Sequence, residues 1–394
     1  MQITLSCPIH SSYRVQQIAG MFDVSLAEKA ERTLQFEAPP SNTGAGSSGW
    51  SIGCIVGPSG SGKSSIARHL FGEHYYTGND WDNGKAVIDN FGDLPIKEIV
   101  RMLTIVGFSS PPSWIKPYSV LSNGEKFRCD LARALLGIRS QETEDRSLET
   151  EVRRQETEVR RQETEVRRIV VYDEYTSVVD RNVAKVASAA LAKALRGRQE
   201  TGVSAAACRL LPAAFVAVTC HYDILDWLEP DWVLDTATGE IVLAAPACGA
   251  QRRLLRRPNI ELEIFRCERS LWSMFKAHHY LSGNLANSCR CYAAVWDGNP
   301  VAFCALLPQQ GFKRWYRVSR IVMLPDYQGI GIGSALLDSL ADLYVQQGFR
   351  FSITASHPSV LSHCKRSERW KASHVKTMGS KHSRGRAVVS FEWR

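Results

Sequence analysis

The chain has 394 residues, 44% of them hydrophobic and 22% charged, which excludes an intrinsically disordered protein and predicts two domains rather than one core. The formal net charge of +8 arises entirely in the C-terminal third, because residues 1–250 carry 26 basic and 31 acidic side chains whereas residues 251–394 carry 22 and 9. This asymmetry predicts an anionic partner for the C-terminal part, either nucleic acid or the phosphates of a cofactor, although a solvated basic surface would have the same composition.

The first motif along the chain is a glycine-rich loop between an apolar strand and a helix. The stretch WSIGCIVGPSGSGKSSIARHL, residues 50–70, fits the pattern G-x-x-x-x-G-K-[ST]. Glycines let backbone amides close around a β-phosphate, Lys63 can reach the β- and γ-phosphate oxygens, and Ser64 can ligate Mg²⁺. We therefore expect ATP to bind at this first glycine loop, made of Gly57, Pro58, Ser59, Gly60, Ser61, Gly62, Lys63, Ser64 and Ser65.

Three further segments follow the loop in order. LSNGEKFRCDLARALL begins at Leu121 and continues as a basic, alanine-rich helix. RIVVYDEYTSVVD, residues 168–180, is an apolar strand that ends in Asp173 and Glu174, and VTCHYD contains His221. A carboxylate at a strand end can ligate Mg²⁺, and a second one can activate the attacking water in phosphoryl transfer.

Together with the glycine loop, these segments resemble the ABC-type ATPase family, whose LSxGE signature is the most specific of them. The resemblance implies Asp173 as a Mg²⁺ ligand and Glu174, Asp180 and His221 as catalytic residues. It also implies an ATP-dependent head-to-tail homodimer, in which the signature binds the nucleotide of a second subunit through Ser122, Asn123, Gly124 and Glu125. The usual glutamine between loop and signature is missing from LTIVGFSSPPSW, and this spacer is short, which favours a soluble ATPase over an exporter.

A repeat interrupts the ATPase-like region. Residues 141–168 are four consecutive heptads of the type QETEVRR, each with at most one apolar residue, so no coiled-coil seam exists. Leu121 and Asp173 are 52 positions apart, and removal of the 28 inserted residues leaves the 24 that are ordinary in the family. We interpret the repeat as an insertion on a loop that leaves the site undisturbed.

The second boundary lies near GAQRRLLRRPN, where glycine, proline and four arginines follow a strand-like run. The sequence therefore predicts an α/β fold with a P-loop ATPase-like domain at residues 1–248, a basic linker at 249–258 and a second domain at 259–394.

The second domain contains another glycine loop. WYRVSRIVMLPDYQGIGIGSALLDSLADLYVQQG reads as a strand, a proline turn, a glycine loop and an amphipathic helix. A helix start of this kind binds anions. The dinucleotide pattern G-x-G-x-x-G does not fit, although other glycine-rich dinucleotide loops stay possible.

This pattern resembles motif A of the GNAT acyltransferases, an α+β fold, over roughly residues 258–394. The resemblance implies that acetyl-CoA or another acyl-CoA binds at Val322, Met323, Gln328, Gly329, Ile330, Gly331, Ile332, Gly333 and Ser334. The amides of residues 328–334 would bind the pyrophosphate, and a strand amide near Met323 would polarise the thioester carbonyl.

The catalytic base of this second site is open. Many GNAT enzymes have a glutamate on the strand before motif A, but this strand reads RVSRIV. His278, His279, Tyr280 and His357 are candidates, because the attacking ammonium must lose a proton. Packing or surface roles fit these four side chains equally well.

The C-terminal tail suggests an acceptor. Residues 364–394 carry nine basic side chains against two glutamates, interleaved with Trp370, Phe391 and Trp393. Basic groups for phosphates and aromatic rings for stacking suit nucleic acid, and HHYL and SRIVMLPDYQG loosely resemble GNAT-like domains of phage DNA-modifying proteins.

Taken together, these patterns predict a cytoplasmic ATP-hydrolysing N-acyltransferase that modifies a base in DNA or RNA. Scattered cysteines and the absence of an apolar run near 18 residues support this compartment and predict no membrane partner. One alternative is a small-molecule or protein N-acetyltransferase regulated by ATP. Another is a non-catalytic ABC-type nucleic-acid clamp whose GNAT fold only binds.

Overall fold

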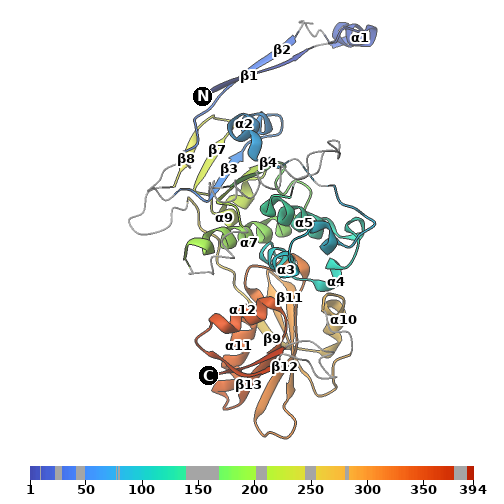
Figure 1. Ribbon diagram of the computed structural model, residues 1–394, viewed down its shortest axis with the longest axis vertical. Helices are drawn as coiled ribbons and strands as arrows, with labels where there is room; N and C mark the ends of the chain where they lie inside the picture. Colours follow the sequence, from blue (N-terminus) through green and yellow to red (C-terminus); the bar gives the residue numbers. More distant parts are fainter. Residues whose placement is uncertain are drawn as a thin grey trace, which may run out of the picture.

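The computed structural model describes residues 1–8, 10–22, 29–40, 49–76, 78, 80–138, 168–200, 211–244, 254–279, 284–376 and 388–394. These residues form an α/β structure with one small and two large sheets, arranged along the long axis of the molecule (Figure 1). A hairpin of β1 (Gln2–Pro8) and β2 (Lys29–Gln35) projects from one end and carries α1 (Tyr13–Phe22) at its tip.

The middle of the molecule is a six-stranded sheet in the order β4-β5-β6-β3-β7-β8, parallel except for β8. Its central strands are continuous apolar runs such as IGCIV and AFVAVT, and every residue of both is buried. This is expected of a parallel sheet that is covered on both faces. The strands are β3 (Ile52–Val56), β4 (Tyr75–Tyr76), β5 (Ile169–Tyr172), β6 (Ala214–Thr219), β7 (Trp232–Asp235) and β8 (Ile241–Leu243).

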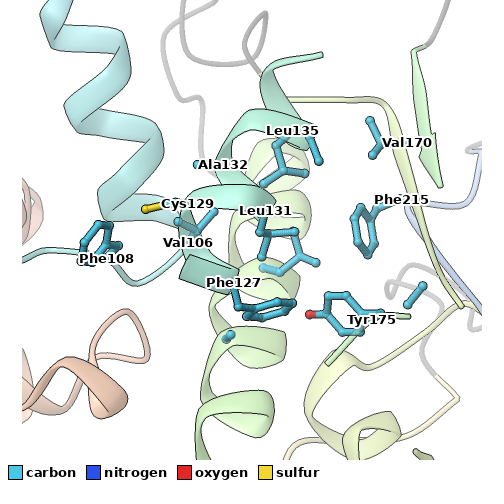
Figure 2. Packing of buried hydrophobic residues seen from close by; sticks show 14 of the residues in the cluster. Val106, Phe108, Phe127, Cys129, Leu131, Ala132, Leu135, Val170, Tyr175 and Phe215 are labelled. Carbon is cyan, nitrogen blue, oxygen red and sulfur yellow. The ribbon is translucent and has the colours of Figure 1, made fainter. Parts of the chain in front are cut away.

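The helices of this part are α2 (Lys63–Phe71), α3 (Ile96–Ile105), α4 (Pro111–Trp114), α5 (Asn123–Leu136), α7 (Arg181–Glu200) and α9 (Leu225–Leu228). Figure 2 shows Phe127, Leu131 and Leu135 of α5 in one buried cluster with side chains of β5 and β6. The rings of Phe127 and Tyr175 lie 5.5 Å apart, edge to face. Helix α5, which begins within the LSNGE segment, is thereby fixed against the sheet.

The heptad repeat lies outside the described residues up to its last position, Arg168. The flanks of the repeat lie side by side, because Arg168 Nη1 donates to the carbonyl oxygen of Leu136 at the end of α5 (2.9 Å). The chain therefore leaves and re-enters this part at one place, which agrees with an insertion on a loop.

The other end of the molecule is a seven-stranded sheet in the order β14-β15-β13-β12-β11-β10-β9, antiparallel except where β12 meets β13. Its strands are β9 (Glu263–Cys267), β10 (Arg290–Trp296), β11 (Asn299–Pro308), β12 (Trp315–Met323), β13 (Arg350–Ala355), β14 (Trp370–Lys376) and β15 (Val388–Trp393). Its helices are α10 (Trp272–Phe275), α11 (Ile332–Gln346) and α12 (Pro358–Arg366).

Short 3₁₀ helices connect these elements: η1 (Gly72–His74), η2 (Val87–Phe91), η3 (Tyr118–Val120), η4 (Tyr222–Ile224), η5 (Arg269–Leu271), η6 (Lys276–His278) and η7 (Pro325–Tyr327).

The two parts pack directly against each other. Val186 and Ala189 of α7 and Trp227 of α9 belong to the same buried cluster as the core of the C-terminal sheet. Trp227 lies 5.8 Å from the ring of Trp296. In Figure 1, α3 and α7 lie over the end of the C-terminal part that carries α12. The interface is therefore apolar at its centre.

A substitution at Gly329 should weaken this interface. Gly329 has φ +95°, and a Cβ there would lie 2.9 Å from both Ala190 Cβ and Gly107 Cα, across the interface. We expect Gly329→Ala to lower the free energy of unfolding by about 3 kcal/mol, from left-handed strain and overpacking together. Urea denaturation followed by tryptophan fluorescence would measure it.

The matched control is Gly298→Ala. Gly298 also has positive φ (+74°), but a Cβ there would meet no atom within 4 Å. This variant should lower the free energy of unfolding only by the backbone strain, about 1 kcal/mol. If both variants lost the same free energy of unfolding, this result would contradict the packing of residue 329 against α7.

Candidate functional site

The first glycine loop is an open anion cradle. Gly62, directly before α2, has the left-handed φ of 94°, which glycine adopts without strain. No side chain of the described residues caps α2, so the amides of residues 63–65 have no partner within the helix and point toward any bound anion. Lys63 Nζ donates to the carbonyl oxygen of Pro58 across the loop (2.8 Å). The lysine predicted to bind phosphate is thus held over the cradle.

The predicted Mg²⁺ ligand and base follow β5. The Asp173 carboxylate accepts hydrogen bonds from the Tyr75 hydroxyl and from the Glu174 backbone N–H (2.9 Å). Burial, and then the bond to Asp173, raise the pKa of Tyr75 to about 12. Glu174 is exposed and has a φ of 50°, which is uncommon for a residue other than glycine. A carboxylate is therefore presented in a strained backbone, as at many functional sites.

His221 and Asp180 lie near the same strand ends. Burial, and then Arg181, lower the pKa of His221 below its ordinary value, and the charges of Asp223 and Glu174 partly oppose this. Asp180 stands at the start of α7, where its Oδ1 accepts from the Asn182 N–H (2.8 Å). The structure thus gives Asp180 a capping role.

The signature segment forms a capping box at the start of α5. Ser122 Oγ accepts from the Glu125 N–H (3.3 Å), and Glu125 Oε2 accepts from the Ser122 N–H (3.1 Å). Ser122 and Asn123 are exposed, whereas Gly124 is buried against Val183. Two of the four signature residues can therefore meet a ligand from outside, and Glu125 is committed to the helix cap.

The second glycine loop repeats the geometry of the first. Gly331, directly before α11, has φ 101° and ψ 1°, close to the 94° and 12° of Gly62. Ile330 and Ile332 are buried, so the loop presents backbone rather than side chains. No side chain in the described parts of the chain caps α11, and the amides of residues 332–334 are free for an anion.

The strand before this loop parts from its neighbour. β12 pairs with β13 in parallel through Trp315–Val318, and the register ends where Val318 meets Ile353. On its other side, β12 pairs with β11, and the pairing register shifts between Ala305 and Leu306. This shift leaves Ser319 unpaired as a β-bulge. The second half of β12 therefore diverges from β13 and opens a space in front of the glycine loop.

This space continues into a cavity of about 1730 Å³ between the two parts of the molecule, here called the interface cavity. One wall is made by residues 318–323, the second glycine loop and residues 353–355, and the opposite wall by α3 and α7. A small-molecule pocket usually holds about 300–1,000 Å³. The interface cavity is thus large enough for a sizeable ligand and a second reactant.

All three predicted histidines, His278, His279 and His357, line the interface cavity. His278 is partly exposed, and His279 is 8% exposed and packs edge-on against the Trp272 ring at 5.7 Å. Tyr280 lies outside the described residues. Arg320 and Ser319 also line the cavity.

Gln328 connects the two parts instead of facing a ligand with its side chain. Its Oε1 accepts from the Ser109 N–H (2.7 Å), and its Nε2 donates to the carbonyl oxygen of Met323 (3.2 Å). Beside it, the fully buried Arg128 of α5 donates to the Asp326 carbonyl oxygen (3.2 Å). Burial lowers the pKa of Arg128 to about 10. The helix after the signature segment is therefore joined to the turn that precedes the second glycine loop.

His357 makes the interface sensitive to pH. Burial lowers the pKa of His357 below its ordinary 6.5, and a hydrogen bond with the Ser109 backbone partly opposes this. At acidic pH the unfolded chain therefore binds more protons than the folded chain. The contribution of His357 to the free energy of unfolding is complete above pH 6.5 and is lost as pH falls through its lowered pKa. We expect the free energy of unfolding to fall on acidification from pH 7 to 5. The difference between wild type and His357→Gln over this range isolates the effect, and parallel curves would contradict it.

The aromatic residues of the tail are not a stacking surface. Trp370, Phe391 and Trp393 are 3%, 1% and 5% exposed and belong to the core beneath α11. The Nε1 atoms of Trp370 and Trp393 donate to Asp338 and Asp342 of α11 (2.8 and 3.2 Å). The expectation that these rings stack on bases is wrong, because Trp370 at the start of β14 and the alternate residues Phe391 and Trp393 of β15 face the core.

Several residues of the sites carry no signal in the sequence. Three of them come from elements far away in the chain: Tyr75, which is hydrogen-bonded to Asp173, Ser109, which is hydrogen-bonded to Gln328, and Lys193, which lies beside Gly331. Only the stacking of the elements brings them to the loops that the motifs predict.

The model of the Acetyltransferase (GNAT) family matches residues 258–361, a range that includes the diverging strand and the second glycine loop. Residues 258–361 form a GNAT acetyltransferase domain. No curated protein is significantly similar to the chain.

Solved structures similar to the chain cover about a third of it. They include the IAA acetyltransferase of Bacillus cereus (14% identity, 34% of this chain and 99% of that one, TM-score 0.27) and the ribosomal-protein-S18-alanine N-acetyltransferase of Escherichia coli (15%, 34% and 93%, 0.28). A GNAT family acetyltransferase of Elizabethkingia anophelis with acetyl-CoA bound is also similar (10%, 34% and 97%, 0.26). None of the helices in the described ranges has the length and apolar character needed to cross a bilayer.

Proposed function

We propose that the chain transfers an acetyl group from acetyl-CoA to an amine at the GNAT domain, in the cytoplasm. The observation that carries this proposal is the anion cradle at the start of α11, which opens directly between the diverging strands β12 and β13. The amides of residues 332–334 would bind the pyrophosphate. The parted strands leave room for the extended arm of the substrate, and the bulge at Ser319 turns the strand edge toward it.

The transfer itself needs a proton acceptor. The amine nitrogen attacks the thioester carbonyl carbon, the carbon–sulfur bond breaks, and the leaving thiolate takes up the proton that the nitrogen loses as the amide forms. Before attack, the incoming ammonium must give a proton to a base. Among the described residues that line the interface cavity, the only carboxylate is that of Glu229. We propose His278 and His279 as the bases to test first. His278 is partly exposed in the cavity and is the more accessible of the two, and the ring of His357 accepts from the Ser359 N–H (3.4 Å).

We propose that the N-terminal part is an ABC-type ATPase domain whose substrate is MgATP. The support is local: a buried parallel strand leads to the first glycine loop, Lys63 lies over it, and Asp173 and Glu174 end a strand of the same sheet. Ser64 and Asp173 would contact Mg²⁺, and the exposed Ser122 and Asn123 could reach the nucleotide of a second subunit in a head-to-tail dimer. Since α5 is joined to the turn before the second glycine loop, ATP-driven movement of α5 would act on the acetyl-CoA site.

The acceptor we propose to test first is a base of DNA or RNA. The support is now charge alone, since the tail aromatics are buried. An anionic small molecule is the second candidate, and the position of the cavity between two parts of the chain favours it.

Incubation with labelled acetyl-CoA tests the proposal. DNA, RNA, proteins and a mixture of anionic amines should be offered separately, each with and without MgATP. We expect label in one acceptor class, with a yield that MgATP changes. No labelled product in any class would contradict the transferase and favour a binding-only clamp.

A further inference from the structure

The interface cavity is strongly cationic. Eight lysine and arginine side chains are among the described residues that line it, against one carboxylate. Arg196 is neutralised by Asp231 (3.2 Å). Lys193, Arg257 and Arg366 form no ion pair with any described residue, although the backbone N–H of Arg257 donates to Glu229 Oε1 (3.2 Å). Within the described residues these cations thus lack a carboxylate partner, and a bound anion can supply the opposite charge.

Lys193 places one of these charges at the acetyl-CoA cradle. It extends from α7, in the N-terminal part, and its Nζ lies 3.8 Å from the position that a Cβ at Gly331 would occupy. Arg257 and Arg366 line the same cavity as Lys193. Burial, and then the charges of Arg366 and Arg257, lower the pKa of Lys193. Ala190, one turn earlier on α7, touches Gly329 of the same loop. Ala190 and Lys193 lie on one face of α7, and this face runs along the second glycine loop.

We propose that the phosphates of acetyl-CoA are bound by both parts of the chain at once: by the amides at the start of α11 and by Lys193, with Arg257 and Arg366 beside it. This inference rests on the proposed function and adds to it that the GNAT domain's cradle is completed by the N-terminal part. Charge-assisted hydrogen bonds to phosphate are about twice as strong as neutral ones. Acetyl-CoA would then hold the interface closed, and a movement of α7 would change its affinity.

Lys193→Gln tests the shared site in the full chain. Titration calorimetry with acetyl-CoA should show a dissociation constant about tenfold higher than that of wild type. Lys193→Arg should restore most of the affinity. Hydrogen exchange of α7 should slow on addition of acetyl-CoA in wild type and change little in Lys193→Gln.

Lys185→Gln is the matched control on the same helix. Lys185 does not line the cavity and lies 4.0 Å from Asp223, so its replacement should leave acetyl-CoA affinity unchanged. Thermal unfolding should show that Lys193→Gln is folded, since the change removes a repulsive charge. Wild-type affinity in Lys193→Gln, or no protection of α7 in wild type, would overturn the shared site and leave the transferase standing. Failure of wild type to bind acetyl-CoA would instead overturn the proposed function.

Discussion

Replacement of Ser334 by glutamate should abolish measurable acetyl-CoA binding without loss of stability. Ser334 is the third residue of α11, lines the interface cavity and is only partly buried. A carboxylate in the first turn is favourable for the helix itself, by about 0.3–1 kcal/mol, because it lies at the positive end of the dipole. The same carboxylate would accept hydrogen bonds from the N–H groups of residues 332–334 in place of the ligand, and its charge would repel the pyrophosphate.

The expected loss of affinity is at least about 100-fold, since two like charges about 4 Å apart repel by roughly 4 kcal/mol at an effective dielectric near 20. Ser334→Gln has nearly the same shape without the charge and should bind acetyl-CoA much more tightly than Ser334→Glu. Titration calorimetry and thermal unfolding of both variants measure affinity and stability. If the glutamate variant binds like wild type, the phosphates do not lie at the start of α11.

Replacement of Lys63 by methionine should remove ATP binding and leave acetyl-CoA binding unchanged. Lys63 is the one cation that the first glycine loop itself supplies, and its ammonium lies over the loop through Pro58. Without it, the β- and γ-phosphates lose a charge-assisted contact, and we expect ATP affinity to fall by at least about 100-fold. ATP-dependent dimers should disappear with it.

Fluorescent ATP titration, sedimentation with and without MgATP, and acetyl-CoA titration together test this variant. Lys85→Met is the control, because Lys85 is exposed and pairs only with Asp82 among the described residues (3.1 Å). Unchanged ATP affinity in Lys63→Met would contradict the ATPase assignment. Competition between ATP and acetyl-CoA in wild type would show that one pocket serves both molecules.

Each anion cradle could be predicted from the sequence, because each is built within one short segment. An apolar strand, a glycine that must adopt positive φ and a helix with uncapped amides are all neighbours in the chain, at residues 52–71 and 315–346. The capping box of Ser122 and Glu125 is local for the same reason. The GNAT match over residues 258–361 agrees with the glycine-loop pattern, and the ATP-binding role of the first loop stays a prediction.

The burial of the tail aromatic residues could not be predicted from composition, because composition does not report the direction of a side chain. Aromatic residues interleaved with lysines and arginines in residues 364–394 also fit strands with one buried face. The register of β14 with β15, Trp370 opposite Trp393, places both rings under α11.

By itself, the sequence determined that two helices begin after glycine loops and have uncapped first amides, because hydrogen-bonding capacity at a helix start depends on adjacent residues. Only the tertiary structure decided that the second loop faces α7, that Lys193 lies beside Gly331 and that Ser109 holds Gln328. These contacts depend on how two sheets and their helices stack, which is set by the fit of distant apolar faces and leaves no periodic trace along the chain.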